Sequence, residues 1–210
     1  MTTRIAILAS GGGTNCQALL DAWRSGQFGQ ADIRLVASNK ADAGALQRAR
    51  AAGVADLVLD PAAYPNRVAY DLELAGRLRS QGVNLVCLAG YLRILTPEFV
   101  RQFPMQIINI HPALLPAFGG EGMYGHRVHE AVLGSGAKFS GCTVHFVDEG
   151  TDTGPIILQA VVPVLDHDTP DKLAERVLIE EHRLYPRAVA LYCEHRLDVA
   201  GRRVRVLEKA

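Results

Sequence analysis

RIAILASGGGTN, residues 4–15, joins an uninterrupted apolar run to a turn rich in glycine. A short apolar run that stops at glycines is typical of a strand buried on both faces of a sheet. Apolar side chains at helical spacing follow in residues 15–23, namely Leu19, Leu20 and Trp23. The stretch therefore predicts a buried strand, a glycine turn and a helix in direct succession.

The rest of the first half repeats this alternation of strand and helix. Apolar runs predict strands at 32–37, 57–59 and 83–89, and helical spacing predicts helices at 43–52 and 67–79. Strands that alternate with helices at this spacing form a parallel sheet covered on both faces. We therefore expect an α/β fold built on a mostly parallel, twisted sheet.

The second half changes the strand pattern. Strands are expected at 138–147 and 156–164, and the short loop between them makes this pair antiparallel. The other elements expected here are a strand at 105–110, a helix at 128–133, a helix at 171–193 that Pro186 should break or kink, and a hairpin at 197–206. The expected fold class is thus α/β, with antiparallel strands confined to the C-terminal half.

The composition excludes several classes of function but does not identify one. Lys+Arg and Asp+Glu both number 22, so the formal net charge is zero, which excludes a broad nucleic-acid or anionic-membrane surface. No apolar run approaches the ~18 residues of a membrane span. The 4 cysteines contain no C-x-x-C pair, which indicates reduced thiols in a cytoplasmic protein. We expect one domain over residues 1–210, with halves at 1–104 and 105–210.

The glycine turn after the first strand is a candidate phosphate site. Backbone N–H groups and a helix N-terminus can bind an anion there, although a plain tight turn remains an alternative. Gly11 and Gly13 half-match the dinucleotide fingerprint, but the second strand ends in Ser38, Asn39 and Lys40 rather than in the acidic residue that binds a ribose. NAD and FAD are therefore excluded, and a smaller phosphate ligand is favoured.

Asn109-Ile110-His111-Pro112 is the sharpest chemical feature. Side chains alternate along a strand, so Asn109 and His111 should point to one side, at the edge of the sheet where α/β proteins bind ligands. Asn can donate to a developing oxyanion and His can move a proton near neutral pH. A structural histidine beside a turn asparagine is the alternative.

The acidic loop 148–154 could supply a carboxylate that orients a histidine, or could be a solvated hairpin tip. It lacks the ligand pattern of a calcium-binding EF-hand. His126 and His129 have no third ligand in view, so no metal is expected. His145 should be a buried strand residue, and the charged run 180–182 should be solvated surface.

Taken together, several segments resemble the phosphoribosylglycinamide formyltransferases, within the wider group of folate-dependent formyltransferases. The resemblance covers residues 4 to about 193 and rests on SGGGTN (10–15), SNKADA (38–43), LAGYLRIL (88–95), NIHPALLP (109–116), GCTVHFV (141–147) and DTGPIILQ (152–159). It implies a Rossmann-like variant that passes the formyl group of 10-formyltetrahydrofolate to the amine of 5′-phosphoribosylglycinamide. That reaction proceeds by direct attack through a tetrahedral intermediate in de novo purine (IMP) biosynthesis.

The resemblance also implies roles for particular residues. The catalytic trio would be Asn109, His111 and Asp152, with a protonated His111 assisting Asn109. The residues implied to bind phosphoribosylglycinamide are Gly12, Gly13, Thr14, Asn15 and Glu181, and those implied to bind folate are Arg67, Leu92, Arg93, Ile94, Leu95, Asn109 and Asp148. Small molecules are the only partners implied, with no metal, nucleic acid or membrane, and the protein would be a monomer or homodimer.

Other functions make different demands on the sequence. Formyltransferases that act on methionyl-tRNA or a nucleotide sugar, and formyltetrahydrofolate hydrolases, usually carry a further domain, for which 210 residues leave no room. A silent folate or nucleotide sensor would not need the Asn109, His111 and Asp152 set, nor would a structural protein. Ala113 replaces a frequent serine of the family, and the loop 118–125 is longer than in some relatives.

Overall fold

The computed structural model describes residues 2–209, and the chain divides into two compact units, Met1–Asn109 and Ile110–Ala210. The first unit alternates strands and helices as the sequence predicts. Its elements are β1 (Arg4–Leu8), α1 (Thr14–Arg24), β2 (Asp32–Ser38), α2 (Gly44–Ala51), β3 (Ala55–Val58), α3 (Arg67–Ser80), β4 (Leu85–Leu88), α4 (Pro97–Val100) and β5 (Ile107–His111), which ends two residues past the unit boundary.

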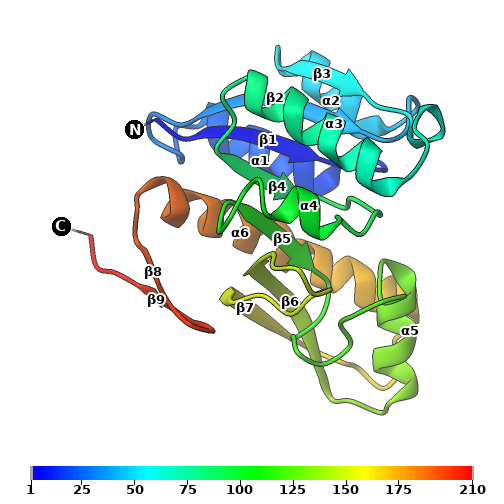
Figure 1. Ribbon diagram of the computed structural model, residues 1–210. Helices are drawn as coiled ribbons and strands as arrows, with labels where there is room; N and C mark the ends of the chain where they lie inside the picture. The colour runs from blue at the N-terminus through cyan, green and yellow to red at the C-terminus, as the bar shows by residue number, and fades with distance from the viewer. Residues whose placement is uncertain (1, 210) are drawn as a thin grey trace. The chain divides into compact units, whose positions relative to one another are not determined.

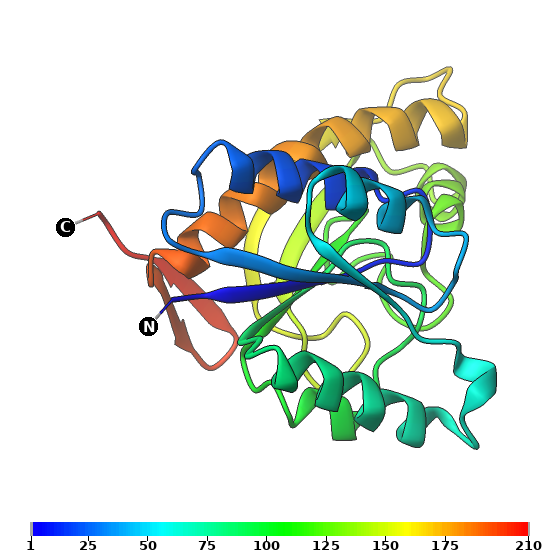
Figure 2. The ribbon, with the colours of Figure 1, turned by 90° about the horizontal axis from the view of Figure 1, so that it is seen from above.

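The strands of the first unit form a parallel sheet in the order β3-β2-β1-β4-β5. Helices α1 and α2 cover one face, and α3 and α4 cover the other (Figures 1 and 2). Strand β1 has a buried apolar side chain at every position after Arg4, as expected for a central strand between two helical layers. This arrangement brings the loops that follow β1, β2 and β4 to the same edge of the sheet.

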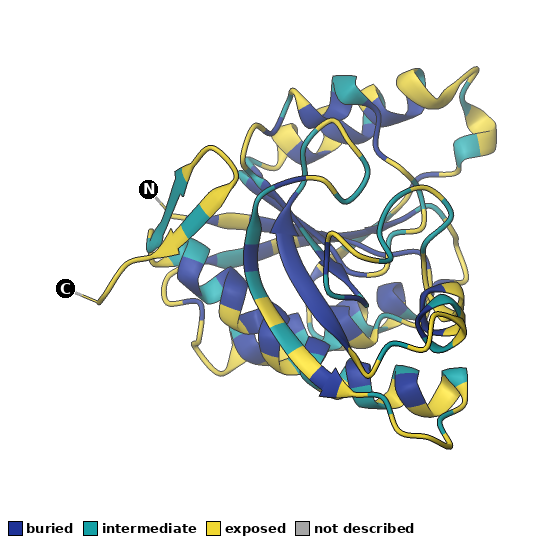
Figure 3. Ribbon diagram, turned by 90° about the horizontal axis from the view of Figure 1, so that it is seen from below, coloured by how far each residue is buried: buried dark blue, intermediate teal, exposed yellow. Residues whose placement is uncertain are grey.

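The second unit is built on an antiparallel pair. Strands β6 (Phe139–Phe146) and β7 (Ile156–Pro163) pair antiparallel, and helix α6 (Pro170–Cys193) packs against both, with α5 (His126–Gly134) beside it. Strand β6 is buried from Ser140 onward, whereas most residues of β7 are half-buried or exposed and only Ile157 and Val162 are buried (Figure 3). A short hairpin, β8 (Leu197–Ala200) and β9 (Arg203–Val206), joins β7 through β9.

The expected fold class is confirmed, and of the break or kink expected at Pro186, the structure shows that no break occurs. Helix α6 continues through Pro186 without a break, because apolar side chains on both sides of it, including Tyr185 and Val189, are buried in the packed interface. Two further short elements lie in the first unit, the helix α4 and a 3-10 turn at Pro61–Ala63. Both begin with a proline in the first turn, a position that proline favours. The helix propensity of so few residues is too weak to predict either element.

Candidate active site

The end of strand β5 carries the first functional side chains. Its burial pattern leaves Asn109 half-buried between the buried Ile108 and Ile110, and His111 is only 4% exposed. Because strand side chains alternate, Asn109 and His111 lie on the same side of β5. Pro112 then ends the strand, as its missing N–H requires.

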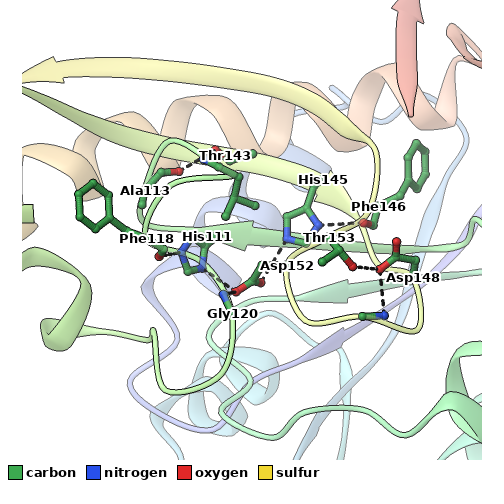
Figure 4. A network of polar contacts seen from close by, with 12 residues as sticks. His111, Ala113, Phe118, Gly120, Thr143, His145, Phe146, Asp148, Asp152 and Thr153 are labelled. Atoms are coloured by element: carbon green, nitrogen blue, oxygen red, sulfur yellow. Dashed lines mark hydrogen bonds and ion pairs between the residues drawn. The ribbon is translucent and has the colours of Figure 1, made fainter. Parts of the chain in front are cut away.

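Both ring nitrogens of His111 face a protein oxygen (Figure 4). Nε2 lies 2.8 Å from the carbonyl oxygen of Phe118, which can only accept a hydrogen bond, so Nε2 carries the proton. Nδ1 lies 3.6 Å from Oδ2 of Asp152. In the neutral ring, Nδ1 therefore presents a lone pair to the carboxylate, and it is the position that a further proton would occupy.

Asp152 stands between two imidazoles. Its Oδ1 lies 3.6 Å from Nε2 of His145, and its Oδ2 accepts a hydrogen bond of 3.0 Å from the backbone N–H of Gly120. The Nδ1 of His145 lies 2.8 Å from the carbonyl of Phe146, so this ring too carries its proton on the far side from Asp152. One carboxylate thus serves two imidazole nitrogens that can each accept a proton (Figure 4).

The pKa values of this cluster shift for identifiable reasons. Burial lowers the pKa of His111, although the Asp152 carboxylate and the Phe118 carbonyl act to raise it. Burial would raise the pKa of the Asp152 carboxyl, but His145, His111 and the Gly120 N–H together hold it below its usual value. The resting cluster is therefore an ionised Asp152 beside a neutral His111, and the imidazolium is the form that arises when a proton arrives.

His145 was not expected among the functional residues, and its position in an apolar strand explains why. The register of β6 against β7 shifts between Val144 and His145. Such bulges re-aim side chains next to active sites, and no simple alternation reveals them. Alternation along the strand therefore gives no signal that His145 faces Asp152.

Thr143 holds the segment that follows His111. Its hydroxyl donates to the carbonyl of Ala113 at 2.6 Å and accepts from the N–H of Leu115 at 3.0 Å and from Nε2 of Gln159 at 3.0 Å. The Gln159 amide also donates to the carbonyl of Leu115 at 3.0 Å. This network fixes the turn directly after β5 to β6 and β7.

The acidic loop between β6 and β7 is ordered by its own side chains. Oδ1 of Asp148 accepts from the Thr153 hydroxyl at 2.6 Å and from the N–H of Gly150 at 3.1 Å. Asp152 adopts a left-handed conformation with φ of 57°, which Asp and Asn tolerate better than most residues. Asp148 thus shapes the loop, and Asp152 is its member that reaches the histidines.

Glu181 is a further correction to the expected surface run 180–182. It is only 7% exposed on helix α6, whereas Glu180 pairs with Arg183 on the same helix. Burial, and then the carboxylate of Glu181, raise the pKa of Cys142 on β6 to about 12. Glu181 therefore belongs to the interior of the second unit, next to the sheet.

The glycine turn of the first unit has the geometry of an anion site. Gly13 is the N-cap of α1 with φ of 73°, and as a glycine it supplies no side-chain cap to the helix. A Cβ on Gly13 would lie 2.7 Å from Cα of Ala45. Arg48 donates to the carbonyl of Gly12 at 2.8 Å and places a positive charge beside the turn.

The loop after β4 presents apolar side chains to solvent. Leu92 is 55% exposed and Ile94 is 44% exposed, whereas Leu95 is buried in the core. The Arg93 guanidinium lies 4.5 Å from the centre of the Tyr70 ring, and Nη2 of Arg67 donates to the carbonyl of Ile94 at 2.8 Å. Exposed apolar residues on a braced loop form a platform for a flat apolar group.

Comparison with known proteins identifies the family to which this chain belongs. Residues 3–189 match the formyl transferase family. The chain belongs to the formyl transferase family.

Named relatives of this formyl transferase cover most of its length. The chloroplastic phosphoribosylglycinamide formyltransferase of Arabidopsis thaliana is 47% identical over 195 residues, 92% of this chain and 66% of that protein. The Escherichia coli K12 phosphoribosylglycinamide formyltransferase is 42% identical over 195 residues, 93% of this chain and 89% of that protein. The crystal structure of glycinamide ribonucleotide transformylase 1 from Symbiobacterium toebii matches with a TM-score of 0.94 and 52% identity, covering 99% of this chain and 95% of that chain.

These matches confirm the resemblance that the motifs indicated. The formyl transferase spans just under two thirds of the Arabidopsis protein. Within residues 2–209, no group of three or more His, Cys, Asp or Glu residues is placed to hold a metal ion. No helix in that range is long and apolar enough to cross a membrane.

The free energy of unfolding of this formyl transferase should decrease as the pH falls. A substitution of His129 tests whether buried histidines cause the decrease. Burial lowers the pKa of both His111 and His129 in the folded chain, so unfolding takes up protons as pH falls below the unfolded value of about 6.5. The free energy of unfolding should therefore rise with pH in this window and level off above it. His129→Phe removes one of these groups and should flatten the slope, as measured by urea unfolding at several pH values.

A matched control comes from a histidine on the surface. His167 is exposed, so His167→Gln should keep the wild-type dependence of unfolding free energy on pH. A His129→Phe protein with the full wild-type slope would contradict the assignment of this dependence to buried histidines.

Proposed function

We propose that this formyl transferase moves the formyl group of 10-formyltetrahydrofolate to the amine of 5′-phosphoribosylglycinamide in purine biosynthesis. The observation that carries the proposal is the Asp152 carboxylate facing His111 and His145 beside the end of β5. Such a cluster can accept and return a proton while an amine attacks a formyl carbon. Relatives with this activity in their names align over nearly the whole chain, which supports the choice of substrates.

The glycine turn is the proposed site for the phosphate of the amine substrate. The N–H groups of Gly12, Gly13, Thr14 and Asn15 lead into helix α1, whose first turn contains no acidic residue to repel an anion. Arg48 adds a positive charge through its contact with Gly12. Glu181 is the proposed partner of the substrate amine in the second unit.

The loop after β4 is the proposed platform for the folate. Leu92 and Ile94 offer exposed apolar side chains that fit a flat pterin ring. Arg93 and Arg67 offer positive charge for the carboxylates of the folate tail. Leu95 contributes from the core side of the loop, and Asn109 and Asp148 are the other proposed folate contacts.

Two donors are available to the charge that develops during the reaction. Attack of the amine on the formyl carbon converts the formyl oxygen into an oxyanion, which hydrogen-bond donors stabilise. The Asn109 amide and the Nε2–H of His111 are the proposed donors. The Nε2–H now donates to the Phe118 carbonyl, so binding of the formyl group would exchange that acceptor for the substrate oxygen.

The proton released by the attacking amine needs an acceptor. The lone pair on Nδ1 of His111 faces Asp152, so a proton arriving there gives an imidazolium that the carboxylate stabilises. His145 offers a second acceptor on the other carboxylate oxygen. The proton then passes to the leaving nitrogen of the folate, and the cluster returns to its neutral resting form.

The proposal extends to the setting of the enzyme. Its cysteines are free thiols, which supports a reducing, cytoplasmic location. Burial raises the pKa of Cys16 to about 12, so this thiol takes no part as a nucleophile. Small molecules are the proposed partners, without a metal, and the enzyme would act as a monomer or homodimer.

The deciding experiment mixes the protein with 10-formyltetrahydrofolate and candidate amines and follows formation of tetrahydrofolate and of the formylated product. We expect formylation of phosphoribosylglycinamide. Turnover only on charged tRNA would identify a different acceptor, and release of free formate without an amine would identify a hydrolase. Either result would overturn the proposal.

A further inference from the structure

Ser10 sits where the first strand passes into the glycine turn, and it is almost fully buried at 2% exposure. Its hydroxyl makes two hydrogen bonds within the first unit. It donates to Oδ1 of Asn39 at 2.6 Å, and it accepts from the backbone N–H of Leu92 at 2.9 Å. The backbone N–H of Ser10 also donates to the carbonyl of Gly90 at 3.0 Å. One residue thus contacts the ends of β2 and β4.

The direction of these bonds is fixed by chemistry. An amide oxygen can only accept, so the single hydroxyl proton of Ser10 points at Asn39. The lone pairs of the hydroxyl are then left for the N–H of Leu92. Asn39 therefore orients the hydroxyl, and the oriented hydroxyl anchors the loop after β4 at Leu92.

The same loop is anchored at its other end by helix α3. The N–H of Thr96 donates to Oδ2 of the buried Asp71 at 2.7 Å, and Arg67 donates to the carbonyl of Ile94 at 2.8 Å. Between these anchors, Leu92 and Ile94 remain exposed. The conformation in which the loop presents its apolar side chains is thus set from both ends, with Ser10 at the end nearest the glycine turn.

We propose that Ser10 is a positioning residue that couples the glycine turn to the loop of residues 90–96. Its hydroxyl holds Leu92 in the conformation that receives the folate, and its backbone leads directly into the turn that receives the phosphate. This role rests on the proposed function for the identity of the ligands. It adds a residue that touches neither substrate yet links the two binding loops of the first unit.

The test is Ser10→Ala, which removes the acceptor of the Leu92 N–H. We expect KM for 10-formyltetrahydrofolate to rise about tenfold, the size of one lost buried hydrogen bond, with kcat within about threefold of wild type. Asn39→Ala, which leaves the hydroxyl unoriented, should shift the same KM in the same direction by less. If Ser10→Ala fails to fold, Asn39→Ala still tests the proposal, because Asn39 is only half-buried.

Ser140→Ala is the matched control. Ser140 is also 2% exposed, and its hydroxyl has no hydrogen-bond partner among residues 2–209. This variant removes the same atom from a buried serine and should keep the wild-type KM for both substrates. An equal rise in KM for Ser140→Ala would attribute the effect to general loosening and overturn the proposal.

Hydrogen exchange separates this proposal from the proposed function. Peptides covering residues 90–96 should exchange faster in Ser10→Ala than in wild type, whereas peptides covering β6 should not change. This readout needs no substrate, so it holds even if phosphoribosylglycinamide is not formylated. Unchanged exchange at 90–96, or a fall in kcat at constant KM, would refute the role of Ser10.

Discussion

Asp152→Asn is expected to lower kcat by about 10²–10⁴-fold while the protein stays folded. The carboxylate faces Nδ1 of His111 and Nε2 of His145, so it stabilises whichever imidazolium forms during proton transfer. An amide has the same shape but carries no charge, and without that charge burial makes protonation of His111 still less favourable. Asparagine also tolerates the φ of 57° at this position, so the backbone need not move.

The measurement is kcat at saturation with both substrates, with circular dichroism to verify folding. KM should change by no more than about threefold, because the proton acceptor acts in the transition state rather than in binding. Asp166→Asn is the matched control, since this carboxylate is exposed and pairs only loosely with Lys138 at 3.6 Å. An Asp152→Asn enzyme with a kcat near the wild-type value would refute the proton-transfer role.

Thr143→Val should cost about 3 kcal/mol in the free energy of unfolding and also reduce kcat. Valine replaces the hydroxyl with a methyl group of similar size, so packing is retained. The carbonyl of Ala113 and the N–H of Leu115 then lose the partner that satisfies them in a buried site. Since Ala113 lies two residues after His111, loosening of this turn should also disturb the catalytic imidazole.

Urea unfolding and steady-state kinetics test this together. Thr143→Ser keeps the hydroxyl and should cost only about 1 kcal/mol for the lost methyl group, with near-normal kcat. Ser140→Ala on the same strand removes a hydroxyl without a hydrogen-bond partner in the described range and should keep both values. Equal destabilisation by Thr143→Ser and Thr143→Val would show that the methyl group, not the hydrogen bonds, matters at this position.

Local patterns in the sequence predict most of the fold because they report burial along one element at a time. Apolar runs located the strands of the first unit, and alternation placed Asn109 and His111 on one side of β5. The same reasoning could not find the contact of Thr143 with Ala113, which joins residues 30 positions apart. It also could not foresee that packing would hold α6 continuous through Pro186.

The sequence also predicted only part of the candidate site. Motif resemblance singled out His111 and Asp152, and the structure places them 3.6 Å apart at Nδ1 and Oδ2. His145 was missed because a shift in strand register, which depends on the partner strand, turns it toward Asp152. Glu181 was assigned to a solvated run because charge predicts exposure, whereas its actual burial depends on how α6 packs.

The close packing of the glycine turn on helix α2 restricts which sequences evolution can use there. A Cβ at Gly13 would meet Cα of Ala45 at 2.7 Å, and one at Gly44 would lie 3.0 Å from the carbonyl oxygen of Gly12. At Gly13 the left-handed φ of 73° adds to this close contact, so selection there acts on backbone shape, independently of the acceptor that is used. Lineages that exchange one acceptor for another should vary freely at exposed positions of α2 yet retain glycine at position 13.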